Sequence, residues 1–378
     1  MTTDRPDPTQ STAEAPRGSA PTGGAAEAPA GQSGGAPRVR YEVPWDADPA
    51  SLVYTFGGAA PVMTLQPGTV LESGSFDCYG NRLNEPGQLP SEVIDSRYLN
   101  PQTGPFEIAG AQPGDTLAVH FHSIEPHADY GVSASIPFFG ALTSTPDTAT
   151  LQDPLPEKSW YYRIDAESGV VHYAAVDSKA TTPLPLDPMH GTVGVAPPLG
   201  EVRSSLAPGS WGGNMDTPEM RAGVTAYFGV NVPGAMFSFG DGHARQGEGE
   251  SCGTAVETAM DTVLSVDLVP GAATPWPRLE SDEYVMTTGS AKPMEDAFRV
   301  AHTEMVRWVA ELTGLSVMDA YQFVSQTSET PIAQACDTVY TVVCKVRKEY
   351  LDAVAASNGM PSPVAPYGGI HARMREFV

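Results

Sequence analysis

Glycine and proline interrupt the chain so often between residues 41 and 270 that long regular elements are disfavoured there. The sequence holds 38 Gly and 36 Pro among 378 residues. Short apolar or alternating runs lie between these interruptions, as in residues 116–122 (TLAVHFH) and 235–239 (AMFSF). Short strands joined by turns have this pattern, because turns use Gly and Pro at positions with special backbone angles. The segment therefore predicts a β-rich body.

The pattern changes after Pro293, where apolar residues recur at the three- and four-residue spacing of a helix. The predicted apolar face consists of Met294, Phe298, Ala301, Met305, Val309 and Leu312. Gly314 supplies a helix stop, and Ser316 followed by Asp319 resembles the N-cap of a second helix. We predict an α+β fold, in which a β-rich body of sandwich- or barrel-like sheets carries a C-terminal pair of helices packed on one face.

Residues 1–40 are predicted to form a disordered, low-complexity tail, and residues 41–378 a single domain. No Ile, Leu, Val, Phe or Trp occurs before Val39. Such a segment cannot offset its ordering entropy by burying apolar surface. We therefore expect no catalytic role for the tail.

The charge balance disfavours anionic partners. The chain has 45 acidic and 21 basic residues, a formal net charge of -24, which repels nucleic acids and anionic lipid surfaces. No run approaches the roughly 20 apolar residues of a membrane helix, and the N-terminus lacks a secretory pattern. We expect a cytoplasmic protein without nucleic-acid or membrane partners. Exposed sheet edges favour a symmetric homo-oligomer.

The segment 240–253 (GDGHARQGEGESCG) interleaves glycines with ionisable side chains directly after an apolar run. In extended backbone, residues two apart face the same side, so Asp241 would pair with His243 and Glu248 with Glu250. A carboxylate beside an imidazole suits zinc, and a nearby glutamate could relay a proton. The alternatives are a hydrogen-bonded pair that holds a turn and a solvated acidic loop.

Three further glycine-bounded segments contain metal-capable or hydrogen-bonding residues. They contribute Asp77 in residues 74–80, His190 in residues 188–194, and Asn214 with Asp216 in residues 212–217. Each also has a purely structural interpretation, an Asx-turn for Asp or Asn and a hydrogen-bonded core histidine for His190. Spacing alone does not decide between these interpretations.

Taken together, the motifs resemble the acetamidase/formamidase family over residues 46–328. The matching segments are 76–78 (FDC), 99–105 (LNPQTGP), 112–115 (QPGD), 124–126 (IEP), 189–197 (MHGTVGVAP), 212–216 (GGNMD), 240–243 (GDGH) and 247–253 (GEGESCG). The resemblance implies a β-rich α+β fold, a divalent metal ion in several relatives, and hydrolysis of short-chain amides such as formamide or acetamide to a carboxylate and ammonia. The chain departs from the pattern in an aromatic segment over residues 159–173 and after residue 331.

Asp77, Asp216, Asp241, His243 and Glu250 fall within motifs similar to the family's acidic and His positions. We predict a divalent ion, with zinc favoured by the ligand types, held by Asp77, Asp241 and His243. The same hypothesis makes Glu250 and Asp216 catalytic and gives His190 and Asn214 to a small amide substrate.

Other mechanisms and functions stay open at this point. Cys252 could act as a nucleophile, although an acidic loop raises the pKa of a thiol. Ser251 lacks the Gly-x-Ser-x-Gly setting of an exposed nucleophile. A small lactam could replace the linear amide as substrate, or the chain could be a noncatalytic scaffold that retains the fold.

Overall fold

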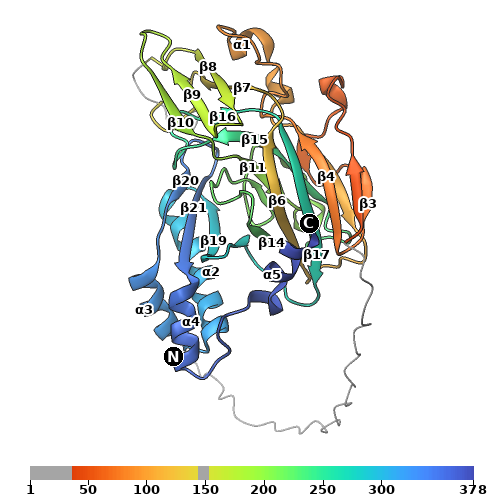
Figure 1. The fold of residues 1–378 in the computed structure, drawn as a ribbon, viewed down its shortest axis with the longest axis vertical. Coiled ribbons are helices and arrows are strands. Elements are labelled where there is room, and N and C mark those ends of the chain that lie inside the picture. The colour runs from red at the N-terminus through yellow and green to blue at the C-terminus, as the bar shows by residue number, and fades with distance from the viewer. Residues whose placement is uncertain (1–35, 144–152) are drawn as a thin grey trace, which may run out of the picture. The chain divides into compact units, whose positions relative to one another are not determined.

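Two large β-sheets carry most of the strands in the computed structural model, which describes residues 36–143 and 153–378 (Figure 1). The first sheet has the order β1 (Arg38–Tyr41), β4 (Thr69–Ser75), β17 (Met260–Val269), β6 (Thr116–Pro126), β14 (Thr225–Gly229), β18 (Arg278–Glu280), β19 (Tyr284–Ala291), β21 (Tyr340–Arg347) and β20 (Ile332–Gln334). The second has the order β10 (Thr181–Pro185), β9 (Val170–Ala174), β8 (Lys158–Asp165), β7 (Tyr130–Ser135), β16 (Val256–Glu257), β15 (Phe237–Arg245), β11 (Met189–Gly194) and β13 (Gly212–Asn214). Strand β5 (Gln102–Ile108) pairs with β15 and with β3 (Met63–Leu65), and β2 (Thr55–Phe56) pairs with β12 (Arg203–Ser204).

Two of the helices are the ones that the sequence predicts. Helix α2 (Met294–Thr313) ends at Gly314, which adopts a φ of 68°. Helix α3 (Val317–Thr327) begins after Ser316, whose hydroxyl accepts a hydrogen bond from the backbone N–H of Asp319 at 3.1 Å. The described residues add α1 (Pro90–Val93), α4 (Lys348–Ser357) and α5 (Ile370–Met374). The β-rich α+β prediction is confirmed, with more helix at the C-terminal end than expected.

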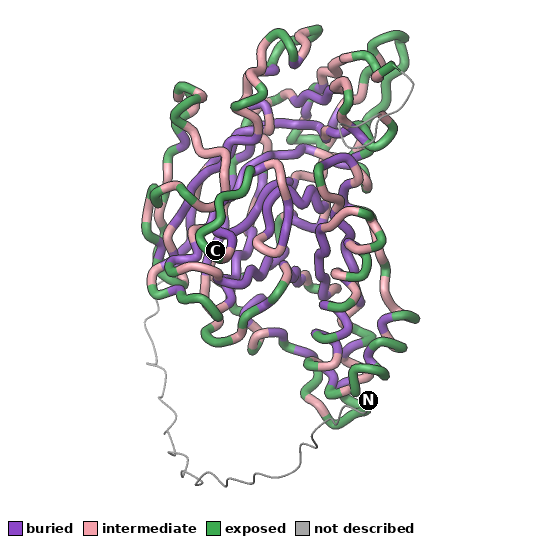
Figure 2. The backbone as a smooth tube through the Cα atoms, turned by 180° about the vertical axis from the view of Figure 1, so that it is seen from behind, coloured by how far each residue is buried: buried purple, intermediate pink, exposed green. Residues whose placement is uncertain are grey.

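The first sheet is covered on both faces, and its strands divide their residues between two cores. Neighbouring residues of one strand face opposite sides. Val119 therefore packs with the second sheet and Ala118 with the helices, and the same division separates Ala226 from Tyr227. Figure 2 shows how burial follows these strands. Because both faces are buried, such strands read as nearly continuous apolar runs.

The predicted boundaries differ from the structure in two places. Ala235 and Met236 have φ angles of 55° and 58°, so β15 begins only at Phe237, but it continues through Asp241 and His243 to Arg245. Phe298, predicted on the buried face of α2, is 46% exposed, whereas Ala297, which was not predicted on that face, is buried along with Ala301.

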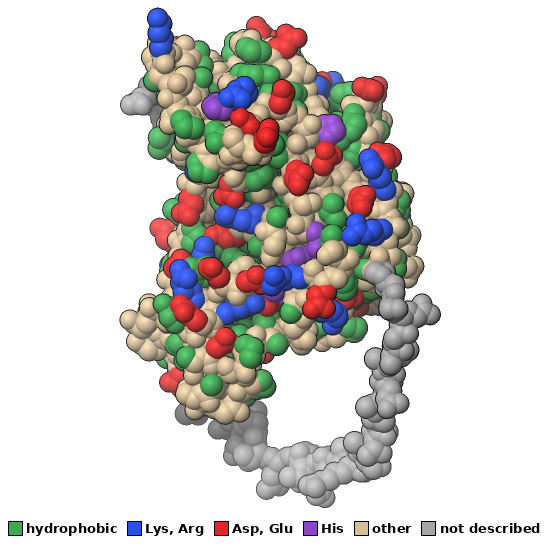
Figure 3. Space-filling view, in the orientation of Figure 1, with side chains coloured by type: hydrophobic (Ala, Val, Ile, Leu, Met, Phe, Trp, Pro, Cys, Tyr) green, Lys and Arg blue, Asp and Glu red, His purple; other side chains and the backbone are tan. Residues whose placement is uncertain are grey.

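The predicted tail lies outside the described residues as far as residue 35, and its last residues, 38–40, belong to β1. Among the described residues, none forms a helix long and apolar enough to cross a membrane. On the face shown in Figure 3, acidic and basic side chains are interspersed.

Two histidines of β6 make stability depend on pH. Burial, with His122 and His371 nearby, lowers the pKa of His120 to about 3, and burial lowers the pKa of His122 to about 4. The unfolded chain binds these protons near pH 6.5, whereas the folded chain does not. Stability from these groups is therefore complete above pH 6.5 and is lost as the pH falls toward 4.

We expect buried His120 to cost about 1 kcal/mol of unfolding free energy between pH 7.5 and pH 5.5, and half-buried His122 to cost less because solvent screens it. Urea unfolding of the wild type and of His120→Gln at both pH values measures this cost. The variant should lose less stability on acidification than the wild type. Equal losses in the two proteins would contradict the assignment.

Candidate active site

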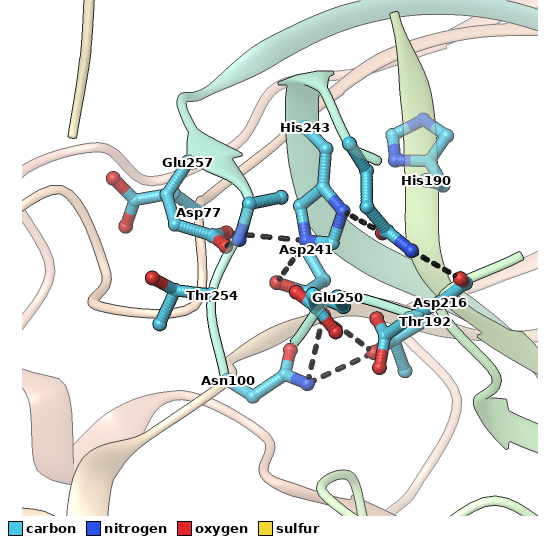
Figure 4. Close-up of polar contacts among 12 residues, drawn as sticks. Asp77, Asn100, His190, Thr192, Asp216, Asp241, His243, Glu250, Thr254 and Glu257 are labelled. Atoms are coloured by element: carbon cyan, nitrogen blue, oxygen red, sulfur yellow. Dashed lines mark hydrogen bonds and ion pairs between the residues drawn. The ribbon is translucent and has the colours of Figure 1, made fainter. Parts of the chain in front are cut away.

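Strands of the second sheet and the loops beside them bring a set of polar side chains together (Figure 4). Asp241 and His243 lie on β15, and Glu257 lies on the neighbouring strand β16. Asp216 follows β13, which pairs with β11. Glu250 lies in the loop between β15 and β16. The structure thus brings together five of the predicted site residues, Asn214, Asp216, Asp241, His243 and Glu250, and adds Glu257.

Gln246 fixes the tautomer of His243. The Gln246 side-chain N–H donates to the carbonyls of Asp216 at 2.6 Å and Ala333 at 3.0 Å, so its Oε1 faces His243 Nδ1 at 2.9 Å. This network assigns a proton to Nδ1. In the neutral imidazole, Nε2 is then an acceptor and a metal-ligand atom.

Three carboxylates share one arrangement, in which a hydrogen bond holds one oxygen and leaves the other free. Asp241 Oδ2 accepts from Thr192 Oγ1 at 3.0 Å. Glu257 Oε1 accepts from the Ala255 N–H at 2.7 Å, and Asp216 Oδ2 accepts from the Asn214 amide at 2.8 Å. Asp216 Oδ1, Asp241 Oδ1 and Glu257 Oε2 are buried without a hydrogen-bond partner. Buried acceptors without partners are costly, so their number at one place fits the binding of a cation.

The free oxygens of Asp241 and Glu257 face the free nitrogen of the imidazole. Asp241 Oδ1 lies 3.3 Å and Glu257 Oε2 3.2 Å from His243 Nε2. Burial opposes a charge on His243, but Glu257 and Asp241 outweigh it and hold the pKa of the imidazole well above its usual value. This point of the site therefore attracts a positive charge, either a proton or a metal ion.

Gly191 leaves room for this cluster. A Cβ at residue 191 would lie 2.7 Å from Asp241 Oδ2, 2.8 Å from His243 Cε1, and closer still to Asp216 Oδ1. Real Cβ atoms essentially never make such contacts. The three side chains can surround this residue only because it is glycine.

The backbone is strained at the same residues. Asp216, Asp241 and Glu250 have φ angles of 45°, 61° and 41°. Non-glycine residues in this region cost about 1–3 kcal/mol each and persist where the surroundings impose them, most often at functional sites. The carboxylates of these three residues are thus held by backbone conformations that are themselves unfavourable.

A cavity of about 300 Å³ opens onto these groups. Its carboxylates are Asp216, Asp241, Glu250, Glu257 and Asp337. Among its described lining residues, none is Lys or Arg. Burial, followed by mutual repulsion, raises the pKa of Asp216 and Glu250 well above the ordinary range, and burial raises the pKa of Asp337 to about 7. The arrangement can hold a divalent cation, for which oxygen and imidazole ligands are suitable.

Two predicted site residues make structural hydrogen bonds instead, although Figure 4 shows Asp77 beside Glu257. Asp77 Oδ1 accepts from the backbone N–H groups of Tyr79 at 2.9 Å and Asn81 at 2.7 Å, as in an Asx-turn. His190 lies in the core, with Nε2 2.8 Å from Thr262 Oγ1 and Nδ1 3.3 Å from the Gly240 carbonyl. Neither residue lines the cavity. The structural interpretation of both residues thus describes what is seen.

Asn214 lines the cavity and positions other groups. Its amide N–H donates to Asp216 Oδ2 and, at 2.7 Å, to Asp337 Oδ2. Its Oδ1 accepts from Asn100 Nδ2 at 2.9 Å. Asn214 therefore fixes two carboxylates of the cavity.

Sequence reasoning missed Glu257, Asp337 and Asn100. Glu257 reaches the cluster through strand pairing, where it lies opposite His243. Asp337 arrives because Gly249 N–H donates to the Ala333 carbonyl at 3.0 Å, joining the Glu250 loop to β20. Asn100 belongs to the recognised segment 99–105, which was the available signal for it. The predicted pairing of Glu248 with Glu250 is wrong, because a turn from Gly247 to Glu250 leaves Glu248 exposed.

The cysteines do not provide an activated nucleophile. Cys252 is exposed and lines a neighbouring cavity, and His243 is not among the residues that line that cavity. Burial and then Glu250 raise the pKa of its thiol. Cys78 lines the cavity itself, but burial and nearby carboxylates raise the pKa of its thiol well above the usual value. A thiolate is disfavoured at both positions.

The chain is similar to known acetamidases in sequence and in structure. A model of the acetamidase/formamidase family matches residues 200–346. An acetamidase structure from Yersinia enterocolitica shares 36% identity, with 83% of this chain and 93% of that chain covered and a TM-score of 0.77. An acetamidase structure from Bacillus halodurans shares 28% identity over 84% and 99% of the two chains, with a TM-score of 0.72. No curated protein sequence matches the chain.

A more distant structure shares the fold alone. The gamma lactamase from Delftia acidovorans is 16% identical, with 82% of this chain and 93% of that chain covered and a TM-score of 0.54.

Taken with the family match and the acetamidase structures, the fold and site define an amidohydrolase that acts on linear amide carbon–nitrogen bonds. The chain belongs to the acetamidase/formamidase family. The family match extends to residue 346, beyond residue 328, where the sequence resemblance was expected to end.

Gly191→Ala tests whether the cluster needs the space beside residue 191. We expect the added Cβ to displace Asp216 and His243, to cost about 1–3 kcal/mol of unfolding free energy, and to remove divalent-ion binding. Urea unfolding and calorimetric titration with zinc measure both effects. Gly247→Ala is the matched control, because a Cβ there meets nothing within 4 Å. Undiminished zinc binding by Gly191→Ala would contradict the prediction that the cluster needs the space beside residue 191.

Proposed function

We propose that the chain hydrolyses a small aliphatic amide of the formamide and acetamide class to a carboxylate and ammonia, with a divalent metal ion, zinc by its ligand types, as cofactor. One observation carries the proposal. Three buried carboxylates each present an oxygen that makes no hydrogen bond, and two of these oxygens lie at ion-pair distance from His243 Nε2, 3.3 Å for Asp241 and 3.2 Å for Glu257. The lining residues thus fit a cation.

Asp241, His243 and Glu257 are the proposed ligands, so that Glu257 replaces Asp77 in the set predicted from sequence. Thr192 orients Asp241, Gln246 orients His243, and the Ala255 N–H orients Glu257. Such outer hydrogen bonds fix ligand direction and basicity. When bound there, the metal ion would polarise the amide carbonyl and lower the pKa of a water molecule.

Glu250 is the proposed general base and acid. It lines the cavity, and its carboxylate lies within 4.8 Å of ligand atoms of Asp216 and His243. It takes a proton from the attacking water as the carbon–oxygen bond forms, and returns that proton to nitrogen as the carbon–nitrogen bond breaks. The products are the carboxylic acid, which ionises, and ammonia.

Asp216 is proposed to orient the amide. Asn214 holds its Oδ2, which leaves the buried Oδ1 free to accept a hydrogen bond. The N–H₂ group of a primary amide supplies such a donor. A site with an unpaired acceptor rejects analogues that lack the donor, because the acceptor then stays unsatisfied.

Removal of metal tests the cofactor. We expect the purified protein to contain a divalent ion, a strong chelator to abolish ammonia release from acetamide, and zinc to restore it. Assays with formamide, propionamide and a γ-lactam define the range. Full activity in the chelator excludes the metal mechanism, and a flat result across all substrates favours a noncatalytic scaffold.

Glu250→Gln tests the proton relay. We expect kcat to fall by about 10²–10⁴-fold, the usual contribution of general acid–base catalysis, with zinc binding retained. Glu248→Gln is the matched control, because Glu248 lies in the same loop but is exposed. Comparable losses in both variants would argue against a specific role for Glu250.

Cys252→Ser separates this mechanism from thiol chemistry. Because Cys252 lies outside the cavity, we expect kcat and KM for acetamide to stay at wild-type values. Steady-state kinetics provides the measurement. Loss of activity in a folded Cys252→Ser protein would revive the nucleophile hypothesis.

A further inference from the structure

The lining of the cavity divides into two chemically different parts. His243 and four of the carboxylates come from the second sheet and its connecting loops, and Asp337 comes from the connection between β20 and β21 of the first sheet. A second part, which we call the apolar wall, consists of Leu99, Ile136, Phe139 and Leu206. Leu99 precedes β5, Ile136 and Phe139 follow β7, and Leu206 follows β12. The carboxylates suit the amide group and a cation, whereas the apolar wall has no polar side chain to offer them.

We propose that the apolar wall binds the acyl chain of the substrate and that Phe139 sets the length of chain that the enzyme accepts. The inference rests on the proposed amide hydrolysis and specifies its substrate class. Formamide carries only hydrogen on its carbonyl carbon, so it leaves the apolar wall uncovered. Small-molecule pockets span roughly 300–1,000 Å³, and this cavity of about 300 Å³ accommodates a longer aliphatic chain.

Phe139 is held in place by close packing against the loop that carries Glu250. A Cβ at Gly253 would lie 2.6 Å from Phe139 Cδ1 and 2.7 Å from Cε1, so the ring lies directly over this glycine. A Cβ at Gly140 would lie 2.7 Å from the Cys252 carbonyl oxygen. The Ala141 N–H donates to the Ser251 carbonyl at 2.9 Å. The ring position is therefore tied to the position of Glu250.

Charge narrows the substrate class further. The cavity contains five carboxylates and, among its described lining residues, no Lys or Arg. An acyl chain with its own carboxylate would be repelled there and would lose its hydration without a partner. The site thus selects neutral aliphatic amides of more than one carbon over formamide and over amides of acidic molecules.

Kinetics over a series of chain lengths tests the proposal. For the wild type we expect kcat/KM to rise about 10-fold per methylene from acetamide to butyramide, as in other apolar pockets, and to fall for longer amides. Phe139→Ala should improve hexanamide relative to acetamide by about 10-fold or more. Phe139→Leu keeps an apolar side chain and should shift the optimum by less. Phe138→Ala is the matched control, because Phe138 is 51% exposed and does not line the cavity.

A binding measurement separates this proposal from the proposed function. Calorimetric titration with the same amides reports the apolar wall without requiring turnover. Two results would support the apolar wall: amide affinity that rises with chain length in the wild type, and a changed dependence on chain length in Phe139→Ala. Both can be observed even when no amide is hydrolysed and the proposed function fails. Hydrolysis with an unchanged chain-length profile in both Phe139 variants overturns the wall and leaves the function standing. Absence of amide binding by the wild type overturns both.

Discussion

The crowding of buried carboxylates around one imidazole is the constraint on which the site depends. Each carboxylate loses its hydration in the cavity, and each raises the pKa of its neighbours. The described lining offers no Lys or Arg to offset them. Isolated buried charges of this kind are too costly to persist unless they are neutralised, paired or bound to metal. The single imidazole is placed so that it touches two of them, which concentrates the attraction for a cation at one point.

The residues around the cluster keep its carboxylates apart and fix the direction of their oxygens. In each of Asp216, Asp241 and Glu257, a hydrogen bond holds one carboxylate oxygen and leaves the other without a hydrogen bond. Asp216 and Asp241 hold their side chains in place with a strained backbone of positive φ. Gly191 removes the side chain that would fill the space between them. Strain of this kind is stabilised by the neighbouring strands β11, β13 and β15, whose residues are almost all buried.

Local patterns in the sequence predicted what depends on local geometry. The helical period and the Ser316 cap gave α2 and α3, and two-residue spacing brought Asp241 and His243 together. Glycine-bounded segments pointed to Asp216 and Glu250, and the family resemblance supported both residues as site candidates. The same local patterns could not separate a ligand from a turn cap at Asp77, since both uses place an aspartate beside glycine. Glu257 and Asp337 escaped prediction because they arrive through strand pairing and through contact between distant loops.

The link between Gly249 and Ala333 makes completion of the cavity a late event in the maturation of the chain. Asp337 follows β20, which pairs with β21 in the first sheet, whereas Glu250 follows β15 in the second. During synthesis, the ribosome must release the segment beyond Asp337 before this carboxylate can close the ring of acidic groups. A chain that contains β15 and β16 but lacks β20 cannot complete the cavity, so the full set of acidic groups requires strands of both sheets.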